Sequence, residues 1–144
     1  FDWNNNQWVL TLSGRQYGFF SLPEEVQELD IPLDVASWRG LEKVYLVHPP
    51  ASSFYPSSSL NQLEAVLGAN GVRLQKACLQ EELCPDVPVI SCSTSPTLVI
   101  ESPIPSSNIT VISKSDLCLI VRASSDEEFQ RVTERIIYEF LGVV

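Results

Sequence analysis

The sequence predicts an α/β or α+β fold, with a single mixed β-sheet of about six to eight strands packed against two main helices. Short runs of β-branched and aromatic residues recur along the chain, and two segments carry apolar residues at helical spacing. Residues 42–78 have the order strand, helix, strand, which is typical of a βαβ unit with parallel strands. Because 144 residues of 44% hydrophobic composition suffice to close one core, we expect residues 1–144 to form a single domain.

The N-terminal part predicts a β-hairpin followed by short helical turns. Residues 7–12 and 15–20 read as strands on either side of a Ser13-Gly14 turn. Pro23 suits the first turn of a brief helix, because its missing N–H needs no partner there, and residues 34–40 form a loop or one helical turn. Since large aromatic side chains are mostly buried, we expect those of this region to pack in the core rather than form an exposed patch: Trp3, Trp8, Tyr17, Phe19 and Phe20.

The middle of the chain predicts the βαβ unit. Residues 42–47 form a strand that ends before Pro49, since proline cannot continue a β-ladder. Residues 59–68 place apolar side chains on one helix face, with Ser59 as the N-cap. Residues 72–78 then alternate as the next strand.

The last part predicts four short strands and the most regular helix. Ser125 and Glu128 form a capping box, and apolar residues repeat on one face through residue 141, so we expect the helix 125–141 to pack on the sheet. The strands are separated by Ser, Pro and Asn turns and lie at residues 87–92, 97–101, 109–113 and 117–121.

Charge and hydropathy exclude two classes of partner. Nine basic and eighteen acidic residues give a net charge of −9, which repels phosphate backbones and anionic lipids, so we predict no nucleic-acid binding. No apolar stretch approaches the roughly 18 residues of a membrane helix, so this segment does not insert directly. The segment begins at Phe1 and contains no methionine, from which we expect a fragment of a longer chain, with any membrane anchor outside it.

The four cysteines form the only constellation with chemical content. Cys78, Cys84 and Cys92 fall inside fifteen residues, and Cys118 lies in an apolar run. Zinc sites use Cys-x2-4-Cys pairs, whereas five, seven and twenty-five residues separate successive cysteines here, so we predict no metal and no cofactor. Acidic neighbours of Cys84 favour the neutral thiol over a reactive thiolate.

An even cysteine count beside a polar loop favours at least one disulfide over four reduced thiols, and the pairing stays open. The candidates for disulfide bonds are therefore Cys78, Cys84, Cys92 and Cys118. Cys118 is either the partner that ties a strand to the loop or a buried thiol that only packs.

A candidate ligand site follows the strand at residues 42–47. His48 stands at its carboxyl end, where open α/β sheets bind ligands, and the serine-rich loop behind it leads into a helix N-terminus that can hold an anion. The loop lacks the glycines that let a phosphate approach the backbone, which favours an ordinary loop over a site. The candidate ligand-binding residues are His48, Ser52, Ser53, Ser57, Ser58 and Ser59.

Two further patterns suggest a glycosylation site and a pair of carboxylates. Asn108-Ile109-Thr110 is a glycosylation sequon, which makes Asn108 a glycosylation candidate if the chain enters a secretory pathway. Glu101 and Asp116 flank apolar strands and would form a carboxylate pair suited to acid–base chemistry if those strands adjoin.

The sequence contains one histidine and no Gly-x-Ser-x-Gly motif, so we predict no catalytic residues. The leading hypothesis is a non-enzymatic, extracytoplasmic domain of a larger or membrane-anchored protein that acts through protein–protein contacts, because disulfides persist in oxidising compartments. The compartment would be secreted, periplasmic, luminal or the cell surface. One alternative is an enzyme or sensor that binds an anionic small molecule at His48 and the serine loop. The other is a cytoplasmic thiol or metal protein.

Overall fold

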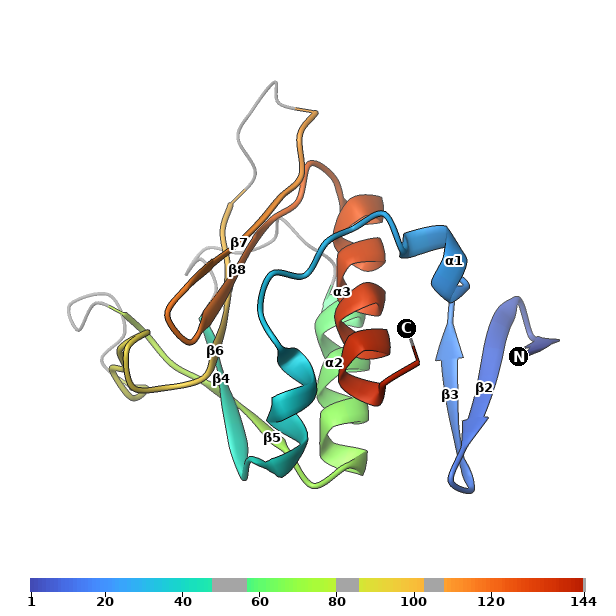
Figure 1. Ribbon diagram of the computed structural model, residues 1–144, viewed down its shortest axis with the longest axis horizontal. Helices are drawn as coiled ribbons and strands as arrows, with labels where there is room; N and C mark the ends of the chain where they lie inside the picture. The colour runs from blue at the N-terminus through green and yellow to red at the C-terminus, as the bar shows by residue number, and fades with distance from the viewer. Residues whose placement is uncertain (48–56, 80–85, 103–107, 144) are drawn as a thin grey trace.

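The computed structural model describes residues 1–47, 57–79, 86–102 and 108–143 and confirms an α/β fold (Figure 1). In these residues, eight strands form two separate sheets, one of five strands and one of three, where the sequence predicts a single sheet. The difference arises because the N-terminal hairpin packs on helices and does not join an edge of the main sheet.

The main sheet is parallel except at one edge. Its strand order is β5-β4-β6-β8-β7, with β7 antiparallel to β8. The predicted βαβ unit is confirmed, since β4 and β5 pair in parallel and helix α2 (Ser57–Ala69) lies between them in the chain. The strands of this sheet are β4 (Lys43–Val47), β5 (Arg73–Lys76), β6 (Thr97–Ile100), β7 (Val111–Ser115) and β8 (Cys118–Arg122).

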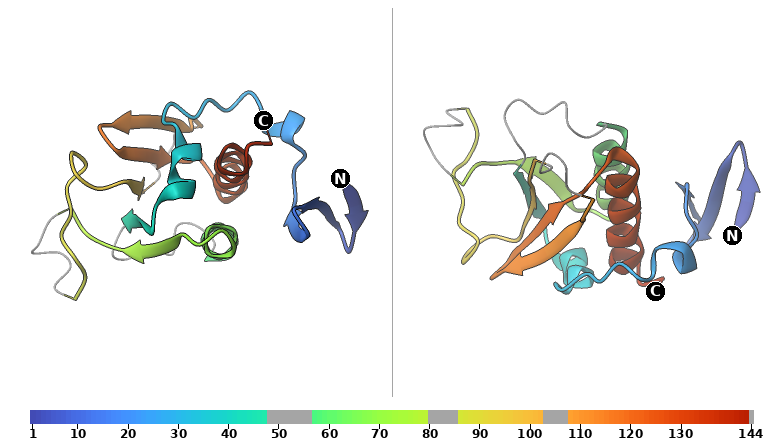
Figure 2. Two further views of the ribbon diagram at one scale, coloured as in Figure 1. Left: turned by 60° about the horizontal axis from the view of Figure 1, so that its bottom comes forward. Right: turned by 90° about the horizontal axis from the view of Figure 1, so that it is seen from above.

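Helices α2 and α3 (Asp126–Leu141) lie side by side over one face of the main sheet (Figures 1 and 2). The N-cap half of the predicted capping box of α3 is confirmed, because the N–H of Glu128 donates to Ser125 Oγ at 3.1 Å, while the Glu128 carboxylate accepts from Arg131 instead. The helix ends at Gly142, whose φ of 75° is the left-handed conformation that glycine adopts most easily at a helix C-terminus.

The three-stranded sheet packs on the side of α3 that faces away from the main sheet (Figure 2). It comprises β1 (Asp2–Asn4), β2 (Gln7–Leu12) and β3 (Arg15–Phe19), which pair antiparallel. The predicted hairpin is confirmed, and Ser13 and Gly14 form its turn with positive φ values of 53° and 80°. β1 is an additional short strand that the sequence did not predict.

Two of the shorter predictions have different outcomes. The brief helix at Pro23 is confirmed as α1 (Pro23–Val26), and residues 35–40 form a 3-10 helix, η1 (Val35–Gly40). The strand predicted at residues 87–92 is wrong, because a single bridge between Cys78 and Val89 is the only pairing found for that segment in the described residues. Pro88 lies inside the segment and cannot donate to a ladder.

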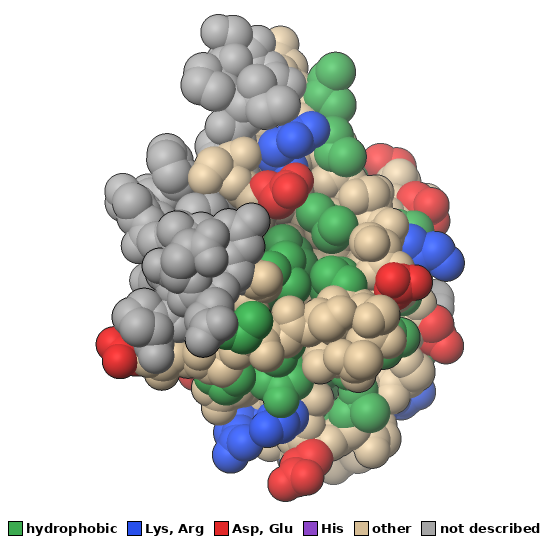
Figure 3. Space-filling view, turned by 90° about the vertical axis from the view of Figure 1, so that its left-hand side faces the viewer, with side chains coloured by type: hydrophobic (Ala, Val, Ile, Leu, Met, Phe, Trp, Pro, Cys, Tyr) green, Lys and Arg blue, Asp and Glu red, His purple; other side chains and the backbone are tan. Residues whose placement is uncertain are grey.

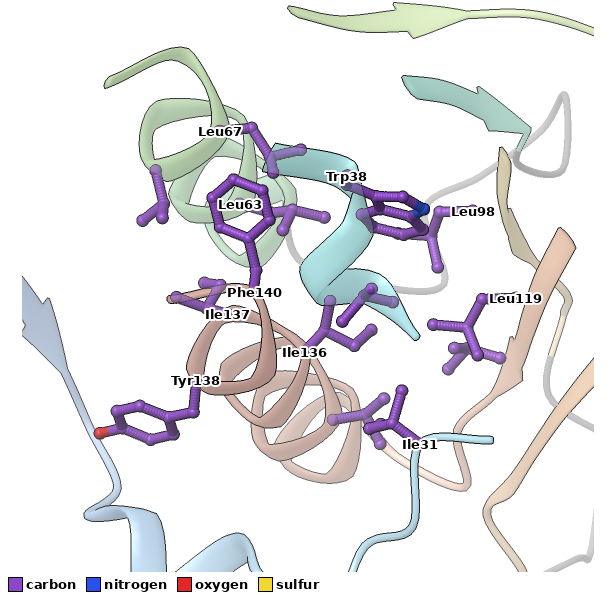
Figure 4. Packing of buried hydrophobic residues seen from close by; sticks show 14 of the residues in the cluster. Ile31, Trp38, Leu63, Leu67, Leu98, Leu119, Ile136, Ile137, Tyr138 and Phe140 are labelled. Carbon is purple, nitrogen blue, oxygen red and sulfur yellow. The ribbon is translucent and has the colours of Figure 1, made fainter. Parts of the chain in front are cut away.

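One cluster of buried side chains joins the main sheet, both long helices and the N-terminal segment (Figure 4). Phe140 of α3 lies beside Leu63 of α2, while Leu98 and Leu119 extend from the sheet toward the helices. Full burial of such side chains stabilises the fold by about 1.5–3 kcal/mol each. Of the hairpin aromatics, Tyr17 and Phe19 are buried and Trp8 is half-buried, whereas Trp3 and Phe20 are exposed, against expectation.

Figure 3 shows the side of the main sheet that faces away from the two long helices. Hydrophobic side chains gather there between polar and charged ones, beside the residues that are not described. Tyr45, Val47 and Ile120 are half-buried and alternate along their strands with the fully buried residues of the helix-facing side. No helix in the described part of the chain is both long and apolar enough to cross a membrane.

Candidate functional site

Cys92 and Cys118 form a disulfide at the start of β8, which confirms the predicted oxidation for this pair. Their Cα atoms lie 5.1 Å apart, and the N–H of Leu117 donates to the carbonyl of Cys92 at 2.8 Å beside the bond. Cys118 is fully buried and pairs in register with Thr97 of β6. The disulfide therefore ties the chain that precedes β6 to β8, and Cys118 is not an isolated thiol.

Cys78 is also disulfide-bonded, while Cys84 lies outside the described residues. The N–H of Cys78 donates to the carbonyl of Pro88 and its carbonyl accepts from the N–H of Ile90, both at 2.9 Å. Among the described residues no cysteine is a free thiol, and no group of three or more His, Cys, Asp or Glu could hold a metal ion. The cysteines seen here contribute covalent ties and no nucleophile.

Most of the predicted anion site lies outside the described residues. Ser58 is exposed in the first turn of α2, but Ser59 is fully buried and its Oγ donates to Gln130 Oε1 at 2.5 Å. The Ser59 hydroxyl therefore joins α2 to α3 and does not face a ligand, so the hypothesis depends on the remaining residues and stays a prediction. Those outside the description are His48, Ser52, Ser53 and the side chain of Ser57.

The glycosylation candidate Asn108 lies at the surface just before β7. Its neighbour Ile109 is 70% exposed, while Thr110 Oγ1 accepts a hydrogen bond from the N–H of Ser124 at 3.1 Å. The Asn108 side chain is thus open to solvent beside an anchored threonine, and its glycosylation stays a prediction.

The carboxylate pair of Glu101 and Asp116 is wrong. Their strands β6 and β8 do adjoin, but they run parallel, so the residue that follows β6 and the residue that precedes β8 lie at opposite ends of the sheet. Glu101 instead faces Arg122, with 3.8 Å between carboxylate and guanidinium atoms. This exposed ion pair stabilises the fold little.

Glu134 of α3 is a fully buried carboxyl that the sequence did not predict. Its Oε2 accepts hydrogen bonds from the N–H of Phe20 at 2.7 Å and from Gln62 Nε2 at 3.0 Å, and its Oε1 accepts from the N–H of Ser21 at 2.9 Å. Burial raises the pKa of the Glu134 carboxyl, and these hydrogen bonds oppose the rise. Because the carboxyl is enclosed and its donors are fixed, its role is to hold the chain after β3 onto α3.

Gln62 and Gln130 continue this network between the helices. Gln130 Nε2 donates to Gln62 Oε1 at 2.7 Å, and Gln62 Nε2 also donates to the carbonyl of Gly18 at 3.0 Å. We call Ser59, Gln62, Gln130 and Glu134 the interhelix polar cluster. It satisfies buried polar groups of both helices and of β3 together.

Three other α3 side chains bind main-chain atoms of the same N-terminal segment. The Tyr138 hydroxyl donates to the carbonyl of Ser21 at 2.6 Å, Arg135 Nε to that of Leu29 at 2.9 Å, and Arg131 Nη2 to that of Glu25 at 2.8 Å. Together with Glu134 they follow the i, i+3, i+4, i+7 spacing of one helix face. The sequence carries no signal that singles out Glu134, because the same helix holds a second glutamate, Glu139, within residues 132–141.

No protein-family model matches the chain, and comparison with curated proteins and with solved structures finds no match either. The functional argument therefore depends on this chain's own residues.

Proposed function

We propose that the chain is a non-enzymatic, extracytoplasmic domain that acts by binding another protein. The observation that supports an extracytoplasmic compartment is the Cys92–Cys118 disulfide. Disulfides form and persist in oxidising compartments and are rare where thiols are kept reduced. Cys78 is disulfide-bonded as well, so a third cysteine is oxidised.

Exposed aromatic side chains on the N-terminal sheet support a role in protein contacts. Trp3 is 57% exposed and Phe20 is 58% exposed, although both residue types are usually buried. Trp3 is also held in place, since its ring lies 5.0 Å from that of Trp8 in an edge-on pair. Rigid exposed aromatic residues are the side chains most enriched at protein interfaces.

The buried carboxyl and the bonded cysteines support a non-enzymatic role, because their reactive atoms are already engaged in contacts within the fold. Glu134 is enclosed by three hydrogen-bond donors, and Cys92 and Cys118 are bonded to each other. These groups hold the architecture together. The net charge of −9 in turn favours a partner with a neutral or basic surface.

The compartment is tested by counting thiols. Protein prepared with an alkylating agent present throughout is measured by intact mass, with and without prior reduction. We expect no alkylated cysteine before reduction and four after it, because the chain contains four cysteines. Four alkylated cysteines before reduction would contradict the extracytoplasmic proposal.

The contact surface is tested with a photo-crosslinking amino acid in the protein's native cells. The photo-crosslinking residue is placed at Trp3 in one variant and at Phe20 in another. We expect both variants to yield a crosslinked adduct of the same discrete mass. The exposed Glu64 on α2 serves as the control position and should not yield that adduct. The absence of a shared adduct at positions 3 and 20 would exclude the N-terminal sheet as the contact surface.

A further inference from the structure

A hollow of about 360 Å³ lies between the tip of the β2–β3 hairpin and the end of α2. Ser13, Arg15 and Tyr17 line it from the hairpin, and Ala69 and Asn70 line it from the end of α2. Its volume lies within the range of small-molecule sites, about 300–1,000 Å³. The hollow is separate from the interhelix polar cluster, because no residue of that cluster lines it.

The buried hydroxyl of Tyr17 is arranged to act as a hydrogen-bond donor in this hollow. Tyr17 is only 8% exposed, and its oxygen accepts a hydrogen bond from Asn70 Nδ2 at 3.3 Å. The amide is fixed in this orientation because Nδ2 also donates to the carbonyl of Val66 at 2.8 Å. The phenolic O–H is therefore left to donate, and it has no acceptor among the described residues.

Arg15 supplies the second donor group and the charge. Its guanidinium forms no ion pair or hydrogen bond with any residue that the structure describes, in a chain with twice as many acidic as basic residues. Arg131 and Arg135 of α3, by contrast, are each paired with a glutamate. An unpaired guanidinium beside a buried donor is suited to an acceptor that carries negative charge.

The surroundings limit how much negative charge the hollow accepts. It lies at the C-terminal end of α2, where the helix dipole disfavours anions. This effect is reduced because the N–H groups of Asn70 and Val72 both donate to the carbonyl of Leu67. Glu64 lines the adjoining hollow, which shares Gly71 with this one, and would repel a multiply charged group.

We propose that this hollow binds a single carboxylate, with Arg15 as the bidentate partner of its two oxygens and the Tyr17 hydroxyl as a third donor. The carboxylate comes either from a small organic acid or from the C-terminal end of a peptide, and the chemistry is the same for both. The site does not depend on the function proposed above.

The site is tested by titrating isotope-labelled protein and following its backbone amide NMR signals. The probes are acetate, N-acetyl-dialanine, the C-terminal amide of that peptide, and inorganic phosphate. We expect saturable shifts with the carboxylates at residues 13–17 and 69–71. Tighter binding of the peptide than of acetate assigns the source to a peptide end, and equal binding assigns it to a small acid.

The variants separate this site from general charge attraction. Arg15→Gln should weaken carboxylate binding by about tenfold and Tyr17→Phe by a smaller factor, because a charged bidentate partner is stronger than a neutral donor. Arg39→Gln, at an exposed arginine on η1, should leave the affinity unchanged. The proposal is overturned if no saturable shift occurs, if the amide or phosphate binds as tightly as the carboxylates, or if Arg15→Gln has no effect.

Discussion

Tyr138 of α3 stacks on Phe19 of β3, with ring centroids 4.3 Å apart and ring planes inclined by 25°. Both side chains are fully buried. The two rings join the N-terminal sheet to α3, and the hydroxyl of Tyr138 adds a hydrogen bond to the next turn of chain at Ser21. The N-terminal sheet is therefore attached by an apolar contact and by polar contacts that the sequence separates by more than a hundred residues.

The stacked pair predicts a large difference between two adjacent phenylalanines. Phe19→Ala should lower the free energy of unfolding by about 3–5 kcal/mol, because it removes a fully buried ring and leaves a cavity. Phe20→Ala is the matched control and should cost no more than about 0.5 kcal/mol, since Phe20 is largely exposed. Urea unfolding followed by circular dichroism measures both. Equal losses would mean that the N-terminal sheet is not packed on α3.

Removal of the Glu134 carboxyl should destabilise the protein by about 3 kcal/mol, because Glu134→Ala leaves the N–H groups of Phe20 and Ser21 without their acceptor. Glu64→Ala on α2 is the control and should change stability by less than about 0.5 kcal/mol, since Glu64 is exposed. Hydrogen exchange gives a second readout. In Glu134→Ala the amides of residues 20 and 21 should lose protection, whereas an unchanged exchange rate there would contradict the contact.

The same carboxyl predicts a pH dependence. Its pKa in the folded protein is raised above 4.5, chiefly by burial, so the folded state binds the proton more tightly than the unfolded state does. Its contribution to stability is therefore fully present below pH 4.5 and is lost as the pH rises through the folded pKa. The difference in unfolding free energy between the wild type and Glu134→Gln should change over this range and level off above it. A difference that is flat from pH 4 to 8 would show that the pKa is not raised.

Loss of the Cys92–Cys118 bond should lower the free energy of unfolding by about 3.5 kcal/mol on the chain-entropy model, since the bond spans 26 positions. The double variant Cys92→Ser/Cys118→Ser is the proper test, because a single change leaves one unpaired thiol. Thermal unfolding of the variant is compared with that of the oxidised wild type. A loss below about 1 kcal/mol would mean that β6 and β8 are held by their ladder alone.

Local patterns in the sequence account for most of the elements. The N-cap at Ser125, the turn at Ser13-Gly14 and the apolar spacing of residues 59–68 each specify their structure within a few neighbouring residues. The predicted strand at residues 87–92 failed because it includes Pro88 and because, in the part of the chain that the structure describes, it pairs only through the bridge between Val89 and Cys78.

The relation between the two sheets could not be predicted, because it depends on contacts between distant residues. Glu134 lies 114 positions from Phe20, and its partner Gln62 lies on another helix. A buried acid on an amphipathic helix looks the same in sequence as a solvated one until its donors are known. The cysteine pairing was open for the same reason, since four cysteines allow three connectivities.

Asn108 predicts a modification that tests the proposed compartment independently of the cysteines. When the chain is produced in a eukaryotic secretory pathway, we expect a glycan at Asn108, because its side chain is exposed and followed by Ile109-Thr110. Asn108→Gln should remove the added mass. Thr110→Ala should remove it too, but that change also deletes the acceptor of the Ser124 N–H, so Thr110→Ser is the control that keeps both the sequon and a hydroxyl. If the secreted protein carries no added glycan mass, either in the wild type or in Thr110→Ser, this exposed sequon is not used.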